Sequence, residues 1–465
     1  MRFSPCKQGL ATETSAERIT FLVCDQARNC IYSLSEHDWI SVWKPESNKA
    51  LRRVQTLGSL QKQALDKAPG APALAQGFRL LSLHVIDRRE SKTGIQLTGL
   101  SQNGVRLYFS PAPSGYSGYG YGSPYGTSDP KHLQLLHVRL PPVNLPHPDE
   151  QLGPQHIQSS PYEPAAQNIP PPVPCVVKDL IAADYVDGIL VASQPGDVEG
   201  KDFLLGITPD ISKIGSLGQA QTPPNPQPVP QNYFFPGGYA SSAAASRLPL
   251  TEQVTMLSLE GTICSIAAVK SSKPPVGVIP ATSPEPLSTN ELATQLTQPQ
   301  HEFLILSNVG ISHLVKRRVL DYLRDALEEA HAEGSLQQIM DFRDNFGRDQ
   351  TCAMLLALAS GNTFLAIDRN RYSLYEEVGT IGPDLAAVAK QAFHDLADRP
   401  IWVERGYGGD AHGNVIFSGR REGLALYFAR LVRPLWRARI AIAGCVRSLL
   451  SSLLFLIFIV TGQPV

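Results

Sequence analysis

The sequence predicts a β-then-α fold, with antiparallel strands over residues 17–316 and helices over residues 317–439. The first observation is a series of short runs in which every second residue is apolar, the pattern of strands with one buried face. In residues 94–109 the alternating positions are Ile95, Leu97, Val105, Leu107 and Phe109. Asn103-Gly104 between them favours the positive φ values of a hairpin turn. The second observation is that the apolar period changes from two to 3.6 near residue 316.

The strands form antiparallel meanders. Residues 18–43 predict a three-stranded meander, with strands at 19–24, 30–34 and 39–43. Further strands are expected at 78–86, 94–101, 104–109, 133–139, 187–193, 202–208, 253–259, 262–269, 302–307 and 311–315. Short strands with tight turns at regular spacing indicate an all-β sandwich or a propeller.

Four insertions interrupt this spacing. Residues 110–131 are dominated by glycine and tyrosine, and 141–174, 219–249 and 271–300 are rich in proline, glutamine and serine. Such compositions cannot bury enough apolar surface to offset chain entropy, so we expect disordered surface loops. Each propeller blade depends on its own strands and its neighbours, so a propeller accepts such loops more readily than a sandwich.

The helical half begins at about residue 316. The first helix is expected from an apolar face that runs from Val319 to Ala330, and Gly334 ends it. Further helices are expected from a capping box at Ser335 and Gln338, over 350–360, from Pro383, and around 424–431 before an interruption at Pro434. Residues 350–360 are apolar nearly all round, which predicts burial between neighbouring helices. Paired helices with short connections indicate an α-solenoid or a bundle.

Residues 440–460 are apolar except for Arg447 and three serines, and arginines flank their N-terminal side. The stretch is long enough to span a bilayer, and the flanking charge suits a tail anchor. Arg447 argues against a span. Two alternatives therefore stay open, a membrane span and a buried or spurious apolar tail.

The composition supplies no pattern for catalysis. The net charge is −1, and the seven cysteines are scattered without a C-x-x-C pair, which suits reduced structural thiols. No H-E-x-x-H or phosphate-loop sequence is present. Glu36, His37 and Asp38 are triad residue types in a hairpin turn, where polar residues are expected anyway. Lys316-Arg317-Arg318 suits a solvated helix end better than a nucleic-acid site. We expect no enzyme activity, cofactor, metal, nucleic acid or small-molecule substrate.

Residues 48–67 interrupt the strands with a helical period. Leu51, Val54, Leu57 and Leu65 would share one face of this helix, while Arg52, Arg53 and other basic residues fall mostly elsewhere. A basic amphipathic helix of this kind can lie on an anionic membrane. The alternative is a helix packed on the edge of the β domain.

Four stretches together resemble one family, the large inner-ring scaffold nucleoporins, in a fungal-like form. They are residues 103–110, 135–142, 349–353 and 417–430. The resemblance implies an N-terminal β-propeller followed by a long C-terminal α-solenoid. Family members are several times longer, so it also implies a partial chain holding the later blades and the first solenoid helices. A truncated product or a misread gene model would explain both ends.

The resemblance further implies a structural role in the nuclear pore complex at the nuclear envelope, without enzymatic activity. The implied partners are other inner-ring scaffold nucleoporins, linker nucleoporins and pore-membrane proteins. Family members touch the nuclear envelope through an amphipathic loop in the propeller, and residues 48–67 correspond to that loop in position. The competing hypothesis is a tail-anchored membrane protein with a cytosolic β-propeller-like interaction domain.

Overall fold

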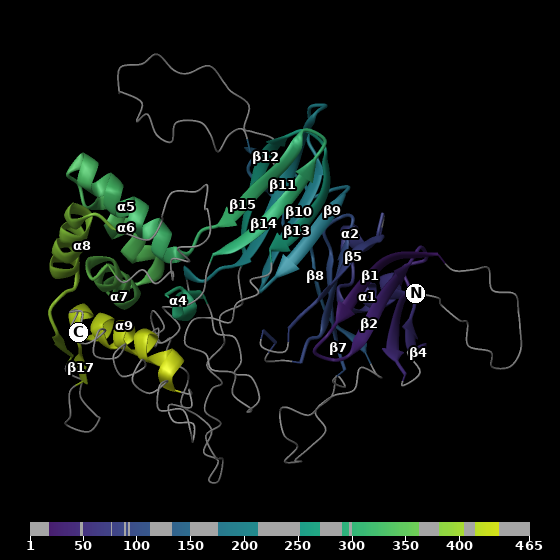
Figure 1. Cartoon of the computed structure of the whole chain (residues 1–465), viewed down its shortest axis with the longest axis horizontal. Coiled ribbons are helices and arrows are strands. Elements are labelled where there is room, and N and C mark those ends of the chain that lie inside the picture. Colours follow the sequence, from purple (N-terminus) through teal and green to yellow (C-terminus); the bar gives the residue numbers. More distant parts are fainter. Residues whose placement is uncertain are drawn as a thin grey trace, which may run out of the picture.

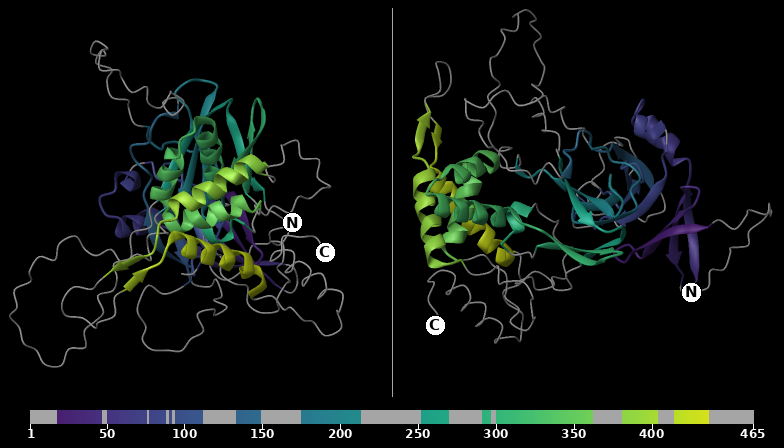
Figure 2. Two further views of the ribbon diagram at one scale, coloured as in Figure 1. Left: turned by 90° about the vertical axis from the view of Figure 1, so that its left-hand side faces the viewer. Right: turned by 90° about the horizontal axis from the view of Figure 1, so that it is seen from above.

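The computed structural model describes residues 18–46, 50–75, 77–87, 90–91, 94–111, 133–148, 175–212, 252–269, 291–296, 300–361, 381–403 and 414–436. Successive antiparallel sheets lie beside one another and lead into a group of helices at one end (Figure 1). Figure 2 shows the same order from above, with the helices at one side and the first sheet at the other. The 440–460 stretch and most of the four predicted insertions lie outside the described residues.

The first sheet contains β1 (Ile19–Asp25), β2 (Cys30–Ser35), β3 (Ile40–Pro45) and β4 (Leu51–Leu57), in that spatial order. The predicted meander is confirmed, and β4 adds a fourth strand. Tyr32 and Leu34 on β2 and Ile40 and Val42 on β3 are fully buried, as period-two alternation requires.

The second sheet contains β5 (Leu80–Val85), β6 (Leu97–Ser101), β7 (Arg106–Ser110) and β8 (Gln134–Arg139). The hairpin predicted over 94–109 is formed by β6 and β7, with Leu97 opposite Phe109. Gly104 in its turn has φ +81°, which explains the glycine at this position.

The third sheet contains β9 (Ala182–Val186), β10 (Ile189–Pro195), β11 (Lys201–Pro209) and β12 (Glu252–Glu260). The fourth contains β13 (Ile263–Val269), β14 (His301–Ser307) and β15 (Gly310–Lys316). In all four sheets, strands that are adjacent in sequence pair side by side as in propeller blades.

Apolar cores lie between the sheets. One core joins the first and second sheets, a second joins the second and third, and a third joins the third and fourth. β10 shows how this works, because Leu190 and Ala192 enter the core toward the second sheet while Ile189 and Val191 enter the core toward the fourth. A strand covered on both faces needs a continuous apolar run, and β10 has one.

The helical part contains α5 (Val319–Glu333), α6 (Gln337–Phe346), α7 (Arg348–Ala359), α8 (Pro383–Leu396) and α9 (Gly419–Trp436). A small hairpin of β16 (Ile401–Val403) and β17 (Asn414–Ile416) lies between α8 and α9. As predicted from its composition, α7 is buried among its neighbours, with Cys352, Met354, Leu355 and Leu358 at most 1% exposed. The β-then-α class and the propeller-like arrangement are therefore confirmed.

Some predictions for individual elements were wrong. β4, β9 and the β16–β17 hairpin had not been predicted, because short strands need tertiary partners that local periodicity does not reveal. The Ser335–Gln338 capping box does not form, since α6 begins after Leu336 and the Gln338 amide donates to Glu333 instead. α9 also continues through Pro434 to Trp436.

One short helix falls inside the predicted insertion 271–300. α4 (Glu291–Thr294) packs Leu292 into the core of the helical part, together with Leu296. Its position shows that a sequence poor in periodicity can still contribute to a core. β15 ends at Lys316 and α5 begins at Val319. The division into a 17–316 and a 317–439 domain stays a prediction.

Candidate functional site

The segment predicted as a lipid-contacting helix, residues 48–67, consists of a strand and a helix. Residues 51–57 form β4, and α1 (Leu60–Lys67) follows. The prediction of one amphipathic helix over this segment was therefore wrong. β4 pairs with β3 from Ile40 opposite Leu57 to Pro45 opposite Leu51. These backbone hydrogen bonds outweigh a helical period that was supported by only a few apolar residues.

The four apolar candidates consequently do not share a face. Leu57 is only 7% exposed and lies in the core between the first two sheets. Leu65 is half-buried against the same core, while Leu51 and Val54 are half-buried on β4. The face predicted to enter a membrane is thus mostly used for internal packing.

The basic candidates are exposed on β4. Arg52 pairs with Glu46 at 3.1 Å, and the Arg53 guanidinium lies 5.8 Å from the ring centroid of Trp43. Both contacts are at the surface, where ion pairs contribute little to stability. The two arginines therefore remain available to an anionic surface, and they are the candidates that the structure leaves accessible.

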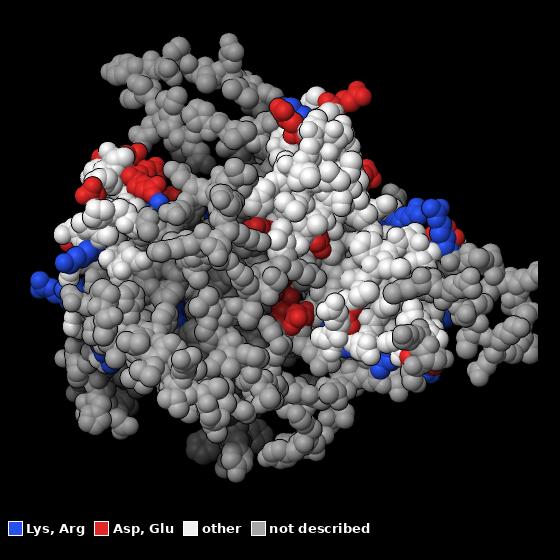
Figure 3. Space-filling view, viewed as in Figure 1, with Lys and Arg blue, Asp and Glu red and all other residues white. Residues whose placement is uncertain are grey.

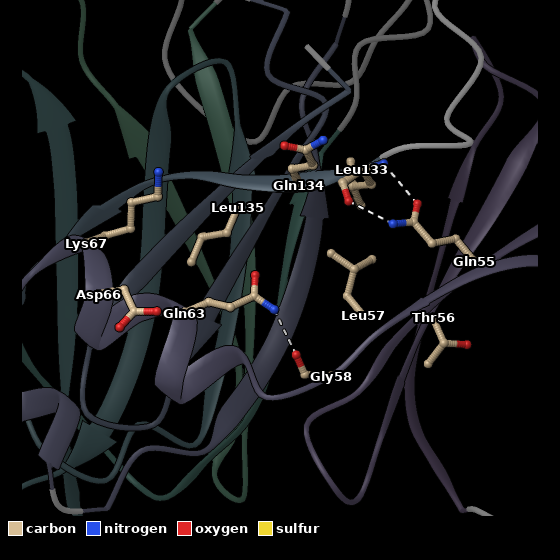
Figure 4. A pocket seen from close by; sticks show the side chains of 10 residues that line it. All are labelled: Gln55, Thr56, Leu57, Gly58, Gln63, Asp66, Lys67, Leu133, Gln134 and Leu135. Atoms are coloured by element: carbon tan, nitrogen blue, oxygen red, sulfur yellow. Dashed lines mark hydrogen bonds between the residues drawn. The ribbon is translucent and has the colours of Figure 1, made fainter. Parts of the chain in front are cut away.

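A hollow of about 490 Å³ lies between β4, α1 and the start of β8 (Figure 4). Gln55 on its rim donates from Nε2 to the carbonyl of Leu133 at 2.9 Å, and its Oε1 accepts from the N–H of Leu133 at 2.9 Å. The side chain amide thus pairs with the backbone as a neighbouring strand would. Gln63 on α1 donates to the carbonyl of Gly58 at 2.8 Å. These paired groups indicate a structural joint rather than a reactive site.

Each joint between successive sheets is held by a polar contact from the region where a sheet's third strand begins: Asp38 and Gln102 lie in the connection before that strand, and Asp202 is the second residue of β11. Asp38 accepts from the N–H of Leu80 at 2.8 Å, the Gln102 carbonyl accepts from the N–H of Leu180 at 2.7 Å, and Asp202 accepts from the N–H of Ile263 at 2.7 Å. In each case the donor lies at or near the entry to the next sheet. This recurring contact fixes the placement of neighbouring sheets.

Asp38 belonged to the triad-like group Glu36-His37-Asp38. The structure gives Asp38 this joint, while His37 lies at the surface with its Nε2 3.9 Å from Glu36. The three residues therefore form a turn, the alternative that their polar composition favours.

Ion pairs strengthen the contact between the second and third sheets. The Arg106 guanidinium on β7 forms two bonds of 2.8 Å with the two carboxylate oxygens of Glu252 on β12, and Arg139 on β8 contacts the same carboxylate. Burial acts to raise the pKa of Glu252, but hydrogen bonds and charge from Arg106 and Arg139 outweigh it and hold the pKa below its usual range. A shared carboxylate thus locks the second and third sheets together.

The basic cluster 316–318 is also structural. Lys316 pairs with Glu291 on α4, and Arg317 pairs with Asp325 at 2.5 Å. Arg318 is buried and pairs with Asp321 at 2.8 Å. The expectation of a simple solvated helix end was wrong for Arg318, because burial here required the carboxylate on the same turn of α5.

The described residues form no candidate metal centre, because within these ranges no three His, Cys, Asp or Glu side chains are grouped as metal ligands. On the face in Figure 3, carboxylates gather over the α5 end of the helical group, and basic residues form no continuous track. Cys24, Cys30, Cys175, Cys264 and Cys352 are outside disulfides. No helix in this part of the chain is long and apolar enough to cross a membrane.

Propeller-like sheets joined by recurring polar contacts and followed by packed helices define a protein of the propeller-and-helix scaffold class. A sequence model of the Nucleoporin_N family, described as "Nup133 N terminal like", matches residues 6–313. The chain belongs to this nucleoporin family, and the resemblance noted in its sequence is confirmed.

Two curated relatives are nucleoporins. The chain is 26% identical over 436 residues to nucleoporin NUP170 of Chaetomium thermophilum, covering 91% of this chain and 27% of the relative. It is 22% identical over 454 residues to a probable nucleoporin of Schizosaccharomyces pombe, covering 92% of this chain and 31% of the relative. The chain therefore spans less than a third of the length of either relative.

A solved structure has a similar fold. The crystal structure of the Chaetomium thermophilum Nup170 N-terminal domain in complex with Nup53 matches with a TM-score of 0.63 and 22% identity. The match covers 93% of this chain and 52% of that one. It extends across both the sheets and the helices, so the order of the two parts is shared.

Proposed function

We propose that this chain is part of a structural scaffold subunit of the inner ring of the nuclear pore complex, and that it works by binding rather than by catalysis. The observation that carries the proposal is the nucleoporin family match over residues 6–313. The sheets of that region lead directly into packed helices, as a large scaffold subunit requires.

The proposed partners are other inner-ring scaffold nucleoporins, linker nucleoporins and pore-membrane proteins. The similar Nup170 domain was crystallised with Nup53, which supports a nucleoporin as partner. Sheets joined by these hydrogen bonds would present a binding surface with little loss of conformational freedom.

A contact with nuclear-envelope lipid through residues 48–67 is part of the same proposal, in an altered form. Leu57 is buried in the core and residues 51–57 form a strand, so this segment does not insert into a membrane as an apolar helix face. The proposed contact is instead an electrostatic attraction between anionic lipid and the exposed Arg52 and Arg53. Each basic residue near an anionic surface contributes about 1 kcal/mol. Such attachment would be weak and would add to protein contacts at the same membrane.

Imaging of the tagged chain in living fungal cells tests the proposal. A punctate nuclear rim that coincides with a known pore marker is the expected result. A reticular distribution throughout the cell's membranes would contradict it and would favour the tail-anchored alternative, which concerns residues 440–460. A variant lacking 440–460 separates the two, because rim localisation of a pore subunit should survive this deletion.

A further inference from the structure

A second hollow, of about 240 Å³, lies in the helical part between α4, α7 and α9. Its apolar walls include Leu292 on α4 and Leu426 on α9. Its polar groups are Gln350 on α7 and Arg430 and Arg433 on α9. Small-molecule pockets usually measure about 300–1,000 Å³, so this hollow suits one or two side chains better than a metabolite.

Arg430 is the unusual member of this lining. It is only 6% exposed, and its Nη2 donates to Oε1 of Gln350. Its Nη1 is buried and has no hydrogen-bond partner among the described residues. Burial lowers the pKa of Arg430 to about 10, which reflects a charge removed from water without compensation. A buried guanidinium of this kind is energetically unfavourable unless a counter-charge is supplied.

The other buried arginines show what is missing. Arg28 pairs with Asp25 at 2.6 Å, Arg106 pairs with Glu252 at 2.8 Å, and Arg318 pairs with Asp321 at 2.8 Å. Each of these arginines has a carboxylate partner within the chain. In the described part of the chain, Arg430 is the buried arginine without one.

The walls of the hollow are held in place independently of Arg430. The Arg318 guanidinium donates to the carbonyl of Gln295 at 2.9 Å, and the Gln295 side chain accepts from the N–H of Leu320 at 3.0 Å, which ties the α4 segment to α5. Opposite, α9 approaches α7 closely at Gly423, where a Cβ would lie 2.4 Å from the Cβ of Cys352. The hollow is therefore formed before any ligand arrives.

We propose that this hollow binds a linear segment of a partner protein through a glutamate or aspartate flanked by an apolar residue. The partner's carboxylate would pair with Arg430, with Arg433 adding positive charge. The apolar neighbour would pack on Leu292 and Leu426. Two arginines beside apolar walls match such a peptide, whereas a nucleic acid needs a longer basic track. The site goes beyond the proposed pore function and stands independently of it.

The test uses the full chain and the probe peptide acetyl-Ala-Leu-Glu-Leu-Ala-amide, with binding measured by calorimetry or by NMR titration. The matched control peptide has glutamine in place of glutamate, and inorganic phosphate is titrated separately. We expect the glutamate peptide to bind at least about tenfold more tightly than the glutamine peptide. Absence of binding, equal binding of both peptides, or phosphate binding as tight as the peptide would overturn the proposal.

Variants locate the binding. Arg430→Met keeps an apolar side chain and removes the charge, so the affinity for the glutamate peptide should fall at least about tenfold. Leu426→Glu places a carboxylate four residues before Arg430 on the same helix and should block the peptide by pairing internally. Arg421→Met, at an exposed position of α9, should leave binding unchanged. Unchanged binding by Arg430→Met would also overturn the proposal.

Stability distinguishes a binding residue from a structural one. Arg430→Met should leave Tm unchanged or raise it, because an unpaired buried charge is removed. Leu426→Glu should behave similarly, since it supplies the missing counter-charge. A fall in Tm of several degrees in both variants would mean that Arg430 serves the fold, and the proposal would then fail.

Discussion

Asp38 joins the first sheet to the second by accepting a hydrogen bond of 2.8 Å from the backbone N–H of Leu80. Asp38 also has φ +59°, a left-handed conformation that aspartate and asparagine tolerate better than most residues. The same position thus requires a short polar side chain for two reasons, the turn and the joint.

A series at Asp38 separates these two roles. Asp38→Asn keeps an acceptor and tolerates the turn, so unfolding free energy should change by less than about 1 kcal/mol. Asp38→Gly tolerates the positive φ but loses the hydrogen-bond acceptor. Asp38→Ala loses the acceptor and is also strained at this φ, so its free energy of unfolding should fall by about 2–3 kcal/mol. Denaturant unfolding measures the series, and exposed Glu36→Ala is the control. A loss for Asp38→Ala no larger than the control's would contradict the joint.

Because Arg106 pairs with Glu252, we expect the free energy of unfolding to fall at acidic pH. Because the pKa of Glu252 is lowered in the folded state, its contribution is present above the unfolded pKa and is lost as pH falls through the folded pKa. Glu252→Gln should cost about 3 kcal/mol at pH 7, since it leaves Arg106 buried without a counter-charge. Unfolding curves at pH 7 and pH 4 measure this, and the difference between variant and wild type should shrink at the lower pH. Glu260→Gln, exposed on the same strand, is the control.

Glu90 predicts the opposite pH dependence. Burial raises the pKa of Glu90 to about 7, against a hydrogen bond from Tyr185 that lowers it. Its contribution to stability is therefore full below the unfolded pKa, about 4.3, and is lost as pH rises toward 7. Glu90→Gln should remove about 2 kcal/mol of the stability change between pH 5 and pH 8. The free energy of unfolding is measured at pH 5 and pH 8, with exposed Glu199→Gln as the control. An equal change in stability between the two pH values for Glu90→Gln and wild type would refute the prediction.

The close approach of α7 and α9 depends on Gly423. A Cβ there would lie 2.4 Å from the Cβ of Cys352, so Gly423→Ala must separate the helices and should cost about 1–3 kcal/mol. Gly382→Ala is the matched control, because its Cβ meets no atom within 4 Å. Thermal unfolding compares the two variants. Equal Tm values would show that the helices can adjust freely.

Lipid attachment through β4 predicts a charge effect. The double variant Arg52→Glu and Arg53→Glu should abolish flotation of the full chain with anionic liposomes and leave Tm nearly unchanged, because both residues are exposed. Leu57→Asp should lower Tm by many degrees, since it buries a carboxylate in the core. Flotation that is equal for wild type and the double variant, or absent for wild type, would remove lipid contact from the proposed function.

The sequence by itself determined the class of the fold and most of its elements. Alternation around Asn103-Gly104 and the uniformly apolar stretch 350–360 are local signals that report burial directly, and both predictions were confirmed. Period and turn chemistry suffice where a segment's own residues specify its conformation. The nucleoporin resemblance was also visible in short stretches of sequence.

Tertiary structure decided the features that depend on distant partners. Residues 51–57 became a strand because β3 offered backbone partners, and Gln55 met Leu133 across 78 positions of the chain. Arg318 and Arg430 are both buried arginines, yet among the described residues only Arg318 pairs with a carboxylate. Such differences arise from long-range packing, which sets the free energy of a buried charge and which no local pattern encodes.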